Sequence, residues 1–215
     1  MNKQIILIAT LLFFSTSYCQ LGKFYPVDET YKDTSLILFR SDLLDAAISN
    51  DTSFIFRHLD TKIFNGFGGD GGIQEFFEVY WPDTSEDGLR PALIRALKLG
   101  GTLHGNVYRI PYATEHSQVQ CSLECGIVIA PNINVREEPN PLSNSLTQLS
   151  YDVVNVVDWT PEESVLDHSK WINIKLLGGK SGWIPEIYLY SPIGYRFTFE
   201  KIDGRWIWTR WAAGD

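Results

Sequence analysis

The side chains best suited to catalysis are few and scattered in this sequence. It has four histidines: His58, His104, His116 and His168. None of them stands in a His-Glu-x-x-His motif or in another paired metal spacing. A thiol nucleophile needs a histidine base, and only His168 follows Cys121 and Cys125. No Gly-x-Ser-x-Gly motif supplies a serine nucleophile. We therefore expect a non-catalytic protein with no metal site and no cofactor.

A glycine-rich segment, Gly66–Gly72, is the strongest phosphate-binding candidate. Backbone N–H groups of such a loop can bind phosphate at the start of a helix. This loop lacks the Lys-Ser/Thr of a P-loop and the spacing of a dinucleotide loop, and Asp70 alone does not make a calcium loop. The sequence favours a tight turn with positive φ before a helix over Ile73–Tyr80, with phosphate binding as the alternative.

Cys121 and Cys125 form a possible disulfide. An oxidising compartment favours a bridge between two such cysteines. In an extended strand, however, their Cα atoms would lie beyond the limit of about 7 Å, so a bridge requires a turn at Ser122–Glu124. The sequence leaves both states open.

The first 19 residues have the pattern of a secretory signal peptide. Lys3 precedes the apolar run Ile5–Phe14, which is shorter than the roughly 20 residues that span a bilayer. We expect cleavage between Cys19 and Gln20, and export to the periplasm or the medium. The alternative is lipid attachment at Cys19, against which the bulky residue before it argues. No later segment is apolar enough to cross a membrane.

Composition limits the possible partners. The chain has 215 residues, of which 44% are hydrophobic and 13% aromatic, enough for a packed core. Its formal net charge of −8 at pH 7 argues against nucleic acid and against anionic membrane surfaces, because both attract basic proteins.

The pattern of residues predicts an α+β fold in four parts after the signal. These are an irregular arm (20–32), a mainly helical α+β domain (33–118), a series of short strands (119–191) and a β-hairpin (192–215). Asp158–Lys170 is expected to be a long loop inserted among the short strands.

The hairpin carries the clearest local signal. Asp203-Gly204 is a typical two-residue turn, and it places Phe199 opposite Trp208 and Phe197 opposite Arg210. An isolated hairpin is barely stable in water, so this aromatic face must be buried elsewhere. We expect it to pack back on the N-terminal domain, with the short strands inserted between the two.

The short strands carry a motif that resembles the bacterial SH3 (SH3b) domain. Its elements are Asn134–Pro139, Leu146-x-x-Leu149, Trp171-x-x-Ile174, Gly179-x-x-Gly182-Trp183-Ile184 and Tyr188-Leu189. The resemblance implies an SH3-like β-barrel of an exported bacterial protein that binds cell-wall peptidoglycan or another exported protein. It does not imply catalysis.

Four motif residues have structural roles in this interpretation. Arg136 can bond carbonyl groups across a turn, and Gly182 can stand where a Cβ would clash. Trp171 and Trp183 can fill a small barrel.

Three other rings, Tyr151, Trp159 and Tyr188, border the predicted loops and are the expected ligand-binding residues. An alternative places the site in the N-terminal domain, which faintly resembles an NTF2-like or cystatin-like cone. That cone would bind a small molecule or act as a weak hydrolase, with the SH3b barrel as a targeting module.

Overall fold

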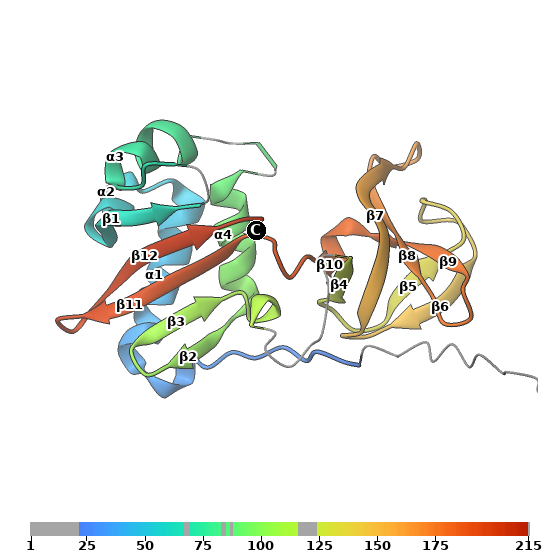
Figure 1. Ribbon diagram of the computed structural model, residues 1–215, viewed down its shortest axis with the longest axis horizontal. Coiled ribbons are helices and arrows are strands. Elements are labelled where there is room, and N and C mark those ends of the chain that lie inside the picture. The colour runs from blue at the N-terminus through green and yellow to red at the C-terminus, as the bar shows by residue number, and fades with distance from the viewer. Residues whose placement is uncertain (1–21, 67–68, 83–84, 87, 116–123, 215) are drawn as a thin grey trace, which may run out of the picture.

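The computed structural model describes residues 22–66, 69–82, 85–86, 88–115 and 124–214. They form two lobes that lie side by side (Figure 1). The N-terminal lobe comprises residues 30–114 together with 196–212, and the second lobe comprises 125–190. Helices and sheets both contribute, which confirms the α+β class. The predicted signal peptide and its cleavage site at Cys19 lie outside the described residues.

The N-terminal lobe packs helices against one sheet. Its helices are η1 (Thr30–Lys32), α1 (Thr34–Ser49), α2 (Thr52–Arg57), α3 (Ile73–Glu75), the π-helix η2 (Phe76–Tyr80), α4 (Leu89–Leu99) and η3 (Tyr112–Thr114). Its strands are β1 (Leu59–Asn65), β2 (Thr102–His104), β3 (Val107–Ile110), β11 (Arg196–Ile202) and β12 (Arg205–Ala212).

Local sequence signals fix the limits of α1. The Asp33 side chain caps its start by accepting hydrogen bonds from the backbone N–H groups of Ser35 (2.8 Å) and Leu36 (3.3 Å). The helix ends where Asn50 adopts a left-handed conformation with φ of 57°. Between these two caps, one side of α1 is buried and packs onto the core of the lobe. This side includes Leu36 and Phe39.

The C-terminal hairpin supplies the centre of this sheet. The strand order is β1-β12-β11-β3-β2, with β1 parallel to β12 and the remaining pairs antiparallel. This confirms that the hairpin packs on the N-terminal part of the chain. The second lobe is therefore an insertion between β3 and β11 (Figure 1).

A β-bulge changes the predicted register of the hairpin. Phe199 lies opposite Trp208, as expected, but Phe197 lies opposite Trp211 and not opposite Arg210. The extra residue is Thr209, which has no partner in the register. The bulge turns Trp211 onto the same buried face as Trp208, which a regular alternation could not do.

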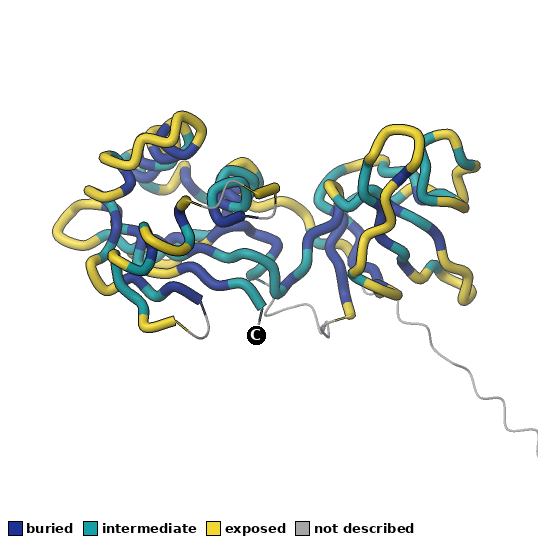
Figure 2. Tube along the Cα trace, turned by 90° about the horizontal axis from the view of Figure 1, so that it is seen from above, coloured by how far each residue is buried: buried dark blue, intermediate teal, exposed yellow. Residues whose placement is uncertain are grey.

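Aromatic rings fill the core of the N-terminal lobe. The Trp208 ring lies 5.1 Å from Phe76, 5.6 Å from Phe197 and 5.9 Å from Phe199 between ring centroids. Figure 2 shows the buried chain segments running through the interior of this lobe. Aromatic side chains thus occupy the core of this lobe.

The second lobe is built almost entirely of strands. They are β4 (Cys125–Val128), β5 (Ile133–Arg136), β6 (Ser145–Leu149), β7 (Val153–Glu163), β8 (Lys170–Lys175), β9 (Ser181–Pro185) and β10 (Leu189–Tyr190), with the 3-10 helix η4 (Glu186–Tyr188) before β10.

These strands form an antiparallel sheet in the order β10-β4-β7-β8-β9-β5-β6. In the described part of the chain its outer strands, β10 and β6, do not pair with each other, so the closed barrel that we expected is not found. One aliphatic cluster nevertheless draws side chains from β4 and β10 at one end of the sheet and from β5 near the other. The sheet therefore bends around a common core.

About half of the expected loop at Asp158–Lys170 is strand. β7 continues to Glu163, and Glu162 pairs with Trp171 on β8. Two register irregularities interrupt this pairing, which explains why the segment lacks a regular alternating pattern.

Candidate functional site

A large groove lies between the two lobes. It has a volume of about 660 Å³, and α4 forms one wall of it. The α1 end, the residues after β4 and the helix η4 complete the lining: Ala47, Ile48, Arg90, Pro91, Ile94, Arg95, Lys98, Leu99, Ile129, Ala130, Ile187 and Tyr188.

The periodicity of α4 explains why the groove is both apolar and basic. One side of this helix, including Leu93 and Leu97, is buried in the N-terminal lobe. Another side presents Arg90, Ile94 and Lys98 to the groove, at successive four-residue steps. The described lining contains no acidic side chain. The groove is thus a basic region on an acidic protein.

Arg95 ties α4 to the edge of the second sheet. Its Nη2 atom donates hydrogen bonds to the carbonyl oxygens of Ile187 (2.9 Å) and Leu189 (3.1 Å). Its guanidinium also lies 5.2 Å from the centre of the Tyr190 ring. Burial lowers the pKa of Arg95, and the nearby Tyr190 and Glu186 oppose that shift. The arginine covers an edge strand that would otherwise offer free carbonyl groups.

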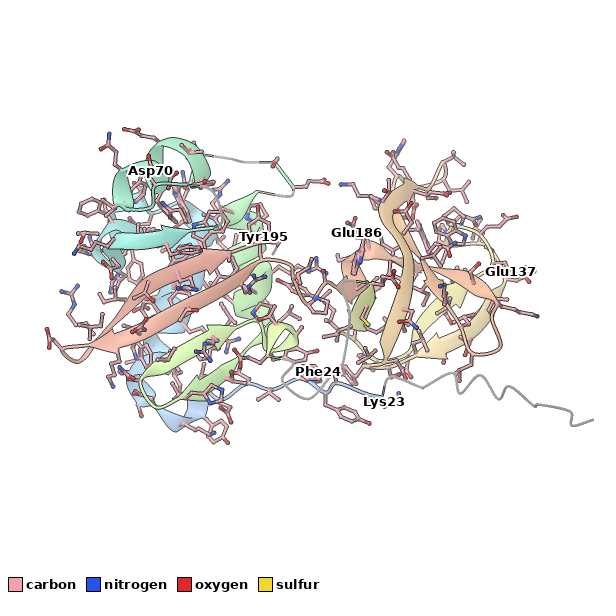
Figure 3. All side chains as sticks on the ribbon, viewed as in Figure 1. Lys23, Phe24, Asp70, Glu137, Glu186 and Tyr195 are labelled. Carbon is pink, nitrogen blue, oxygen red and sulfur yellow. The ribbon has the colours of Figure 1, made fainter. Side chains whose placement is uncertain are left out.

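A smaller cavity of about 240 Å³ lies beside the groove and shares Arg95 with it. Its lining includes two acidic residues, Glu86 and Glu186, in contrast to the groove. Figure 3 shows Glu186 on the second lobe and Tyr195 on the side of the N-terminal lobe, facing the same junction. Lys170 forms an ion pair with Glu86 at 3.3 Å, which links the lobes across this cavity.

A buried cluster and the N-terminal arm hold the lobes together. The cluster consists of Tyr112, Ala113, Cys125, Ile127, Val153 and Tyr190, and so takes residues from both lobes. Burial raises the pKa of Tyr112 to about 12. In the arm, Phe24 stacks on Tyr112 with ring centroids 5.7 Å apart, and Lys23 forms an ion pair with Asp152 at 3.0 Å (Figure 3). These contacts set the separation of the groove walls.

Two of the three rings expected to bind a ligand lie in these cavities. Tyr188, which is 39% exposed, lines the groove, and Trp159 lines the smaller cavity. Tyr151 does not line either one. It packs against Tyr25 of the N-terminal arm, with ring centroids 5.6 Å apart.

The motif residues of the second lobe make structural contacts. Arg136 donates to the carbonyl oxygen of Ser143 (2.5 Å) across a turn. A Cβ on Gly182 would lie 2.7 Å from Val135. Both contacts fit the structural roles expected of these residues.

The two motif tryptophans do not fill the core of the second lobe as we expected. Successive side chains on a strand point to opposite faces, so Trp171 is buried on one face of β8 and Ile172 on the other. Trp183 is only half-buried. The core consists of aliphatic residues instead: Val128, Val135, Val154, Val156, Ile172, Ile174, Ile184 and Leu189.

The described end of the glycine-rich segment, Gly69–Gly72, is held by a carboxylate of the chain. Gly71 and Gly72 have φ values of 77° and 91°, which confirms the expected positive φ. The Glu75 carboxylate accepts hydrogen bonds from the Gly71 N–H (2.9 Å) and the Asn65 side chain (3.0 Å). This internal anion takes the N–H donor that a phosphate would need. Figure 3 places Asp70 at the far end of the molecule from Glu186.

The histidines are spread over the structure. His58 follows α2 next to β1, and His104 ends β2, so they lie at opposite edges of the five-stranded sheet. His168 lies between β7 and β8, and His116 lies outside the described residues. Among the side chains that the structure describes, no three of His, Cys, Asp or Glu form a group that could hold a metal ion.

Cys125 is disulfide-bonded. Its expected partner, Cys121, lies outside the described residues. The bonded sulfur of Cys125 is not available as a thiolate nucleophile.

Comparisons with known proteins return no match. No protein-family model matches the chain, and no curated protein or solved structure is significantly similar to it. Within the described residues, no helix has both the length and the apolar character needed to cross a membrane.

Proposed function

We propose that this chain is a non-catalytic, exported binding protein that takes its ligand in the groove between the lobes. The second lobe acts as an SH3b-like module in this proposal, and the ligand is a cell-wall peptide or a segment of another exported protein. The motif contacts of Arg136 and Gly182, and the bending of the sheet around one core, support the SH3b-like interpretation.

The groove itself is the observation that carries the proposal. Its volume of about 660 Å³ lies within the range of about 300–1,000 Å³ that is typical of small-ligand sites. Its lining combines apolar side chains with a few charged groups, a combination that gives affinity from burial and orientation from polar contacts. Because contacts on both sides hold the lobes in place, a ligand would find the walls already formed.

The arrangement of reactive side chains favours binding over catalysis. A nucleophile and its base must lie within hydrogen-bonding reach of each other. The sulfur of Cys125 is bonded, while His58 and His104 lie on opposite edges of a sheet. The groove lining offers cations and a phenol, with no acidic side chain described there to act as a base.

The proposal is tested by filling the groove with a large side chain. Soluble peptidoglycan fragments are titrated into the wild type and into Ala130→Trp, whose new ring would occupy the groove. A matched control is Leu142→Trp, which places the same ring at a turn residue that is 82% exposed. We expect at least tenfold weaker binding for Ala130→Trp and unchanged binding for the control.

Equal thermal midpoints for the three proteins would show that the fold is intact. Unchanged affinity in a folded Ala130→Trp protein would contradict a groove site. Failure of the wild type to bind any fragment would exclude cell-wall peptide as the ligand.

A further inference from the structure

Three groove residues of α4 form a regular stripe. Arg90, Ile94 and Lys98 follow one another at four-residue steps and line the same groove. With a rise of about 1.5 Å per residue, each step is about 6 Å, and the two cations are about 12 Å apart along the helix. The order of side chains along the stripe is thus cation, apolar residue, cation.

Neither cation of the stripe has an acidic partner in the part of the chain that the structure describes. Two other cations of this lobe do form ion pairs: Arg40 with Asp28 at 2.7 Å, and Lys201 with Asp33 at 2.7 Å. Unpaired cations beside an apolar surface favour a ligand with matching anions, and the protein's net charge of −8 makes such a basic site unusual for this surface.

We propose that the groove binds a short acidic peptide in an extended conformation, with the pattern acidic-x-apolar-x-acidic. This inference rests on the proposed function and specifies its ligand. In an extended peptide, residues i, i+2 and i+4 point to the same side and are about 6.8 Å apart. The two carboxylates would meet Arg90 and Lys98, and the central apolar side chain would lie over Ile94.

The size and charge of the groove favour this ligand over two others. A stable contact with a folded protein buries about 800 Å² on each partner, more than a groove for a small ligand offers. A fatty acid carries one carboxylate and would leave one of the two cations unpaired. A short peptide with two carboxylates pairs with both.

The test uses three synthetic peptides and the full chain. The first is Ac-Glu-Ala-Leu-Ala-Glu-NH2, and the second replaces both Glu with Gln. The third, Ac-Ala-Glu-Leu-Glu-Ala-NH2, has the same composition but places the carboxylates on the opposite side from Leu. We expect the first peptide to bind at least tenfold more tightly than either of the others in calorimetric titrations.

A charge swap tests the two cations directly. Arg90→Glu/Lys98→Glu should lose binding of the Glu peptide by at least tenfold, and should gain binding of Ac-Lys-Ala-Leu-Ala-Lys-NH2. The control, Lys175→Glu/Lys180→Glu, makes the same change in net charge at two exposed residues of the second lobe that do not line the groove. It should bind the Glu peptide as the wild type does.

The possible results separate this inference from the proposed function. If the wild type binds the Glu and Gln peptides equally and Ala130→Trp weakens both, the groove binds peptides and the charge pattern is wrong. If laurate binds as tightly as the Glu peptide and competes with it, the peptide class is wrong. If the Glu peptide does not bind, or binds regardless of the charge swap, the inference is overturned.

Discussion

The two lobes reach their stability in different ways. In the N-terminal lobe, strands far apart in the sequence pair with each other, as where Leu59 lies opposite Trp208, and aromatic rings fill the core. In the second lobe, β7, β8 and β9 pair in chain order, and aliphatic side chains fill the core. The N-terminal lobe therefore needs segments from before and after the insertion, whereas the second lobe is one continuous segment.

This difference predicts how far the destabilising effect of a deletion or substitution should extend through the structure. When β11 and β12 are removed, the sheet of the N-terminal lobe loses its centre, and β1 is separated from β3 and β2. A lobe built from neighbouring strands keeps most of its contacts when the other lobe is altered. The groove joins a helix of the dependent lobe to the edge of the continuous one.

The largest expected effect comes from ending the chain after Ser191. The deletion removes β11 and β12, so β1 loses its neighbour β12, β3 keeps only β2 beside it, and the core loses Trp208 and Phe199. We expect the backbone amides of β3 and α4 to exchange with solvent rapidly, while those of β8 stay protected. Hydrogen exchange read by mass spectrometry measures both lobes at once. If the β3 amides stayed protected in the shortened chain, the N-terminal lobe would not depend on the hairpin as we expect.

A medium effect is expected at the contact between the lobes. Arg95→Met keeps the length of the side chain but removes the donor to the Ile187 and Leu189 carbonyl groups. Hydrogen bonds to charged groups contribute about 1.5–3 kcal/mol, so we expect the free energy of unfolding to fall by roughly 2 kcal/mol. Urea denaturation gives the value.

Arg90→Met serves as the matched control for Arg95→Met on the same helix. Arg90 has no acidic partner among the described residues, and we expect its replacement to change stability by less than about 0.5 kcal/mol. Equal losses for the two variants would mean that Arg95 is not the residue that holds the sheet edge.

The smallest expected effect lies within the N-terminal lobe and depends on pH. The Lys201 ammonium and the Ser35 hydroxyl lower the pKa of Asp33 to about 2. Since the unfolded value is about 3.9, the pair stabilises the folded chain above that pH, and the contribution is lost as the pH falls towards 2. Partly exposed pairs contribute about 0.2–1 kcal/mol.

Asp33→Asn isolates this contribution, because Asn caps a helix about as well as Asp but does not titrate. Between pH 4 and pH 2, the free energy of unfolding should fall less steeply in the variant than in the wild type. Parallel curves would show that the Asp33–Lys201 pair does not link the hairpin to α1.

Local signals made much of the fold predictable from sequence. Asp203-Gly204 marked the hairpin turn. The bulge at Thr209 was missed, because an alternating strand gives no local sign of one unpaired residue. The closed barrel was wrong because pairing between edge strands depends on curvature, which residue patterns do not encode.

The groove could be predicted only in part. Exposed rings near loops led to Tyr188 and Trp159, which line the two cavities. Arg95 was missed, since its partners are carbonyl groups more than 90 residues along the chain, as the separations of 92 and 94 show. The stripe on α4 was missed as well, because its value as a site depends on a second wall that the other lobe supplies.

The position of the hairpin has a consequence for biosynthesis. The ribosome releases β1 and the helices early, yet the central strands of their sheet are made only after the inserted lobe. Domains commonly fold in the order of translation. Here, however, the inserted lobe is complete before the N-terminal lobe receives its central strands, β11 and β12. During that interval the nascent chain exposes the apolar sides of α1 and α4, which favours aggregation until β11 and β12 have been made.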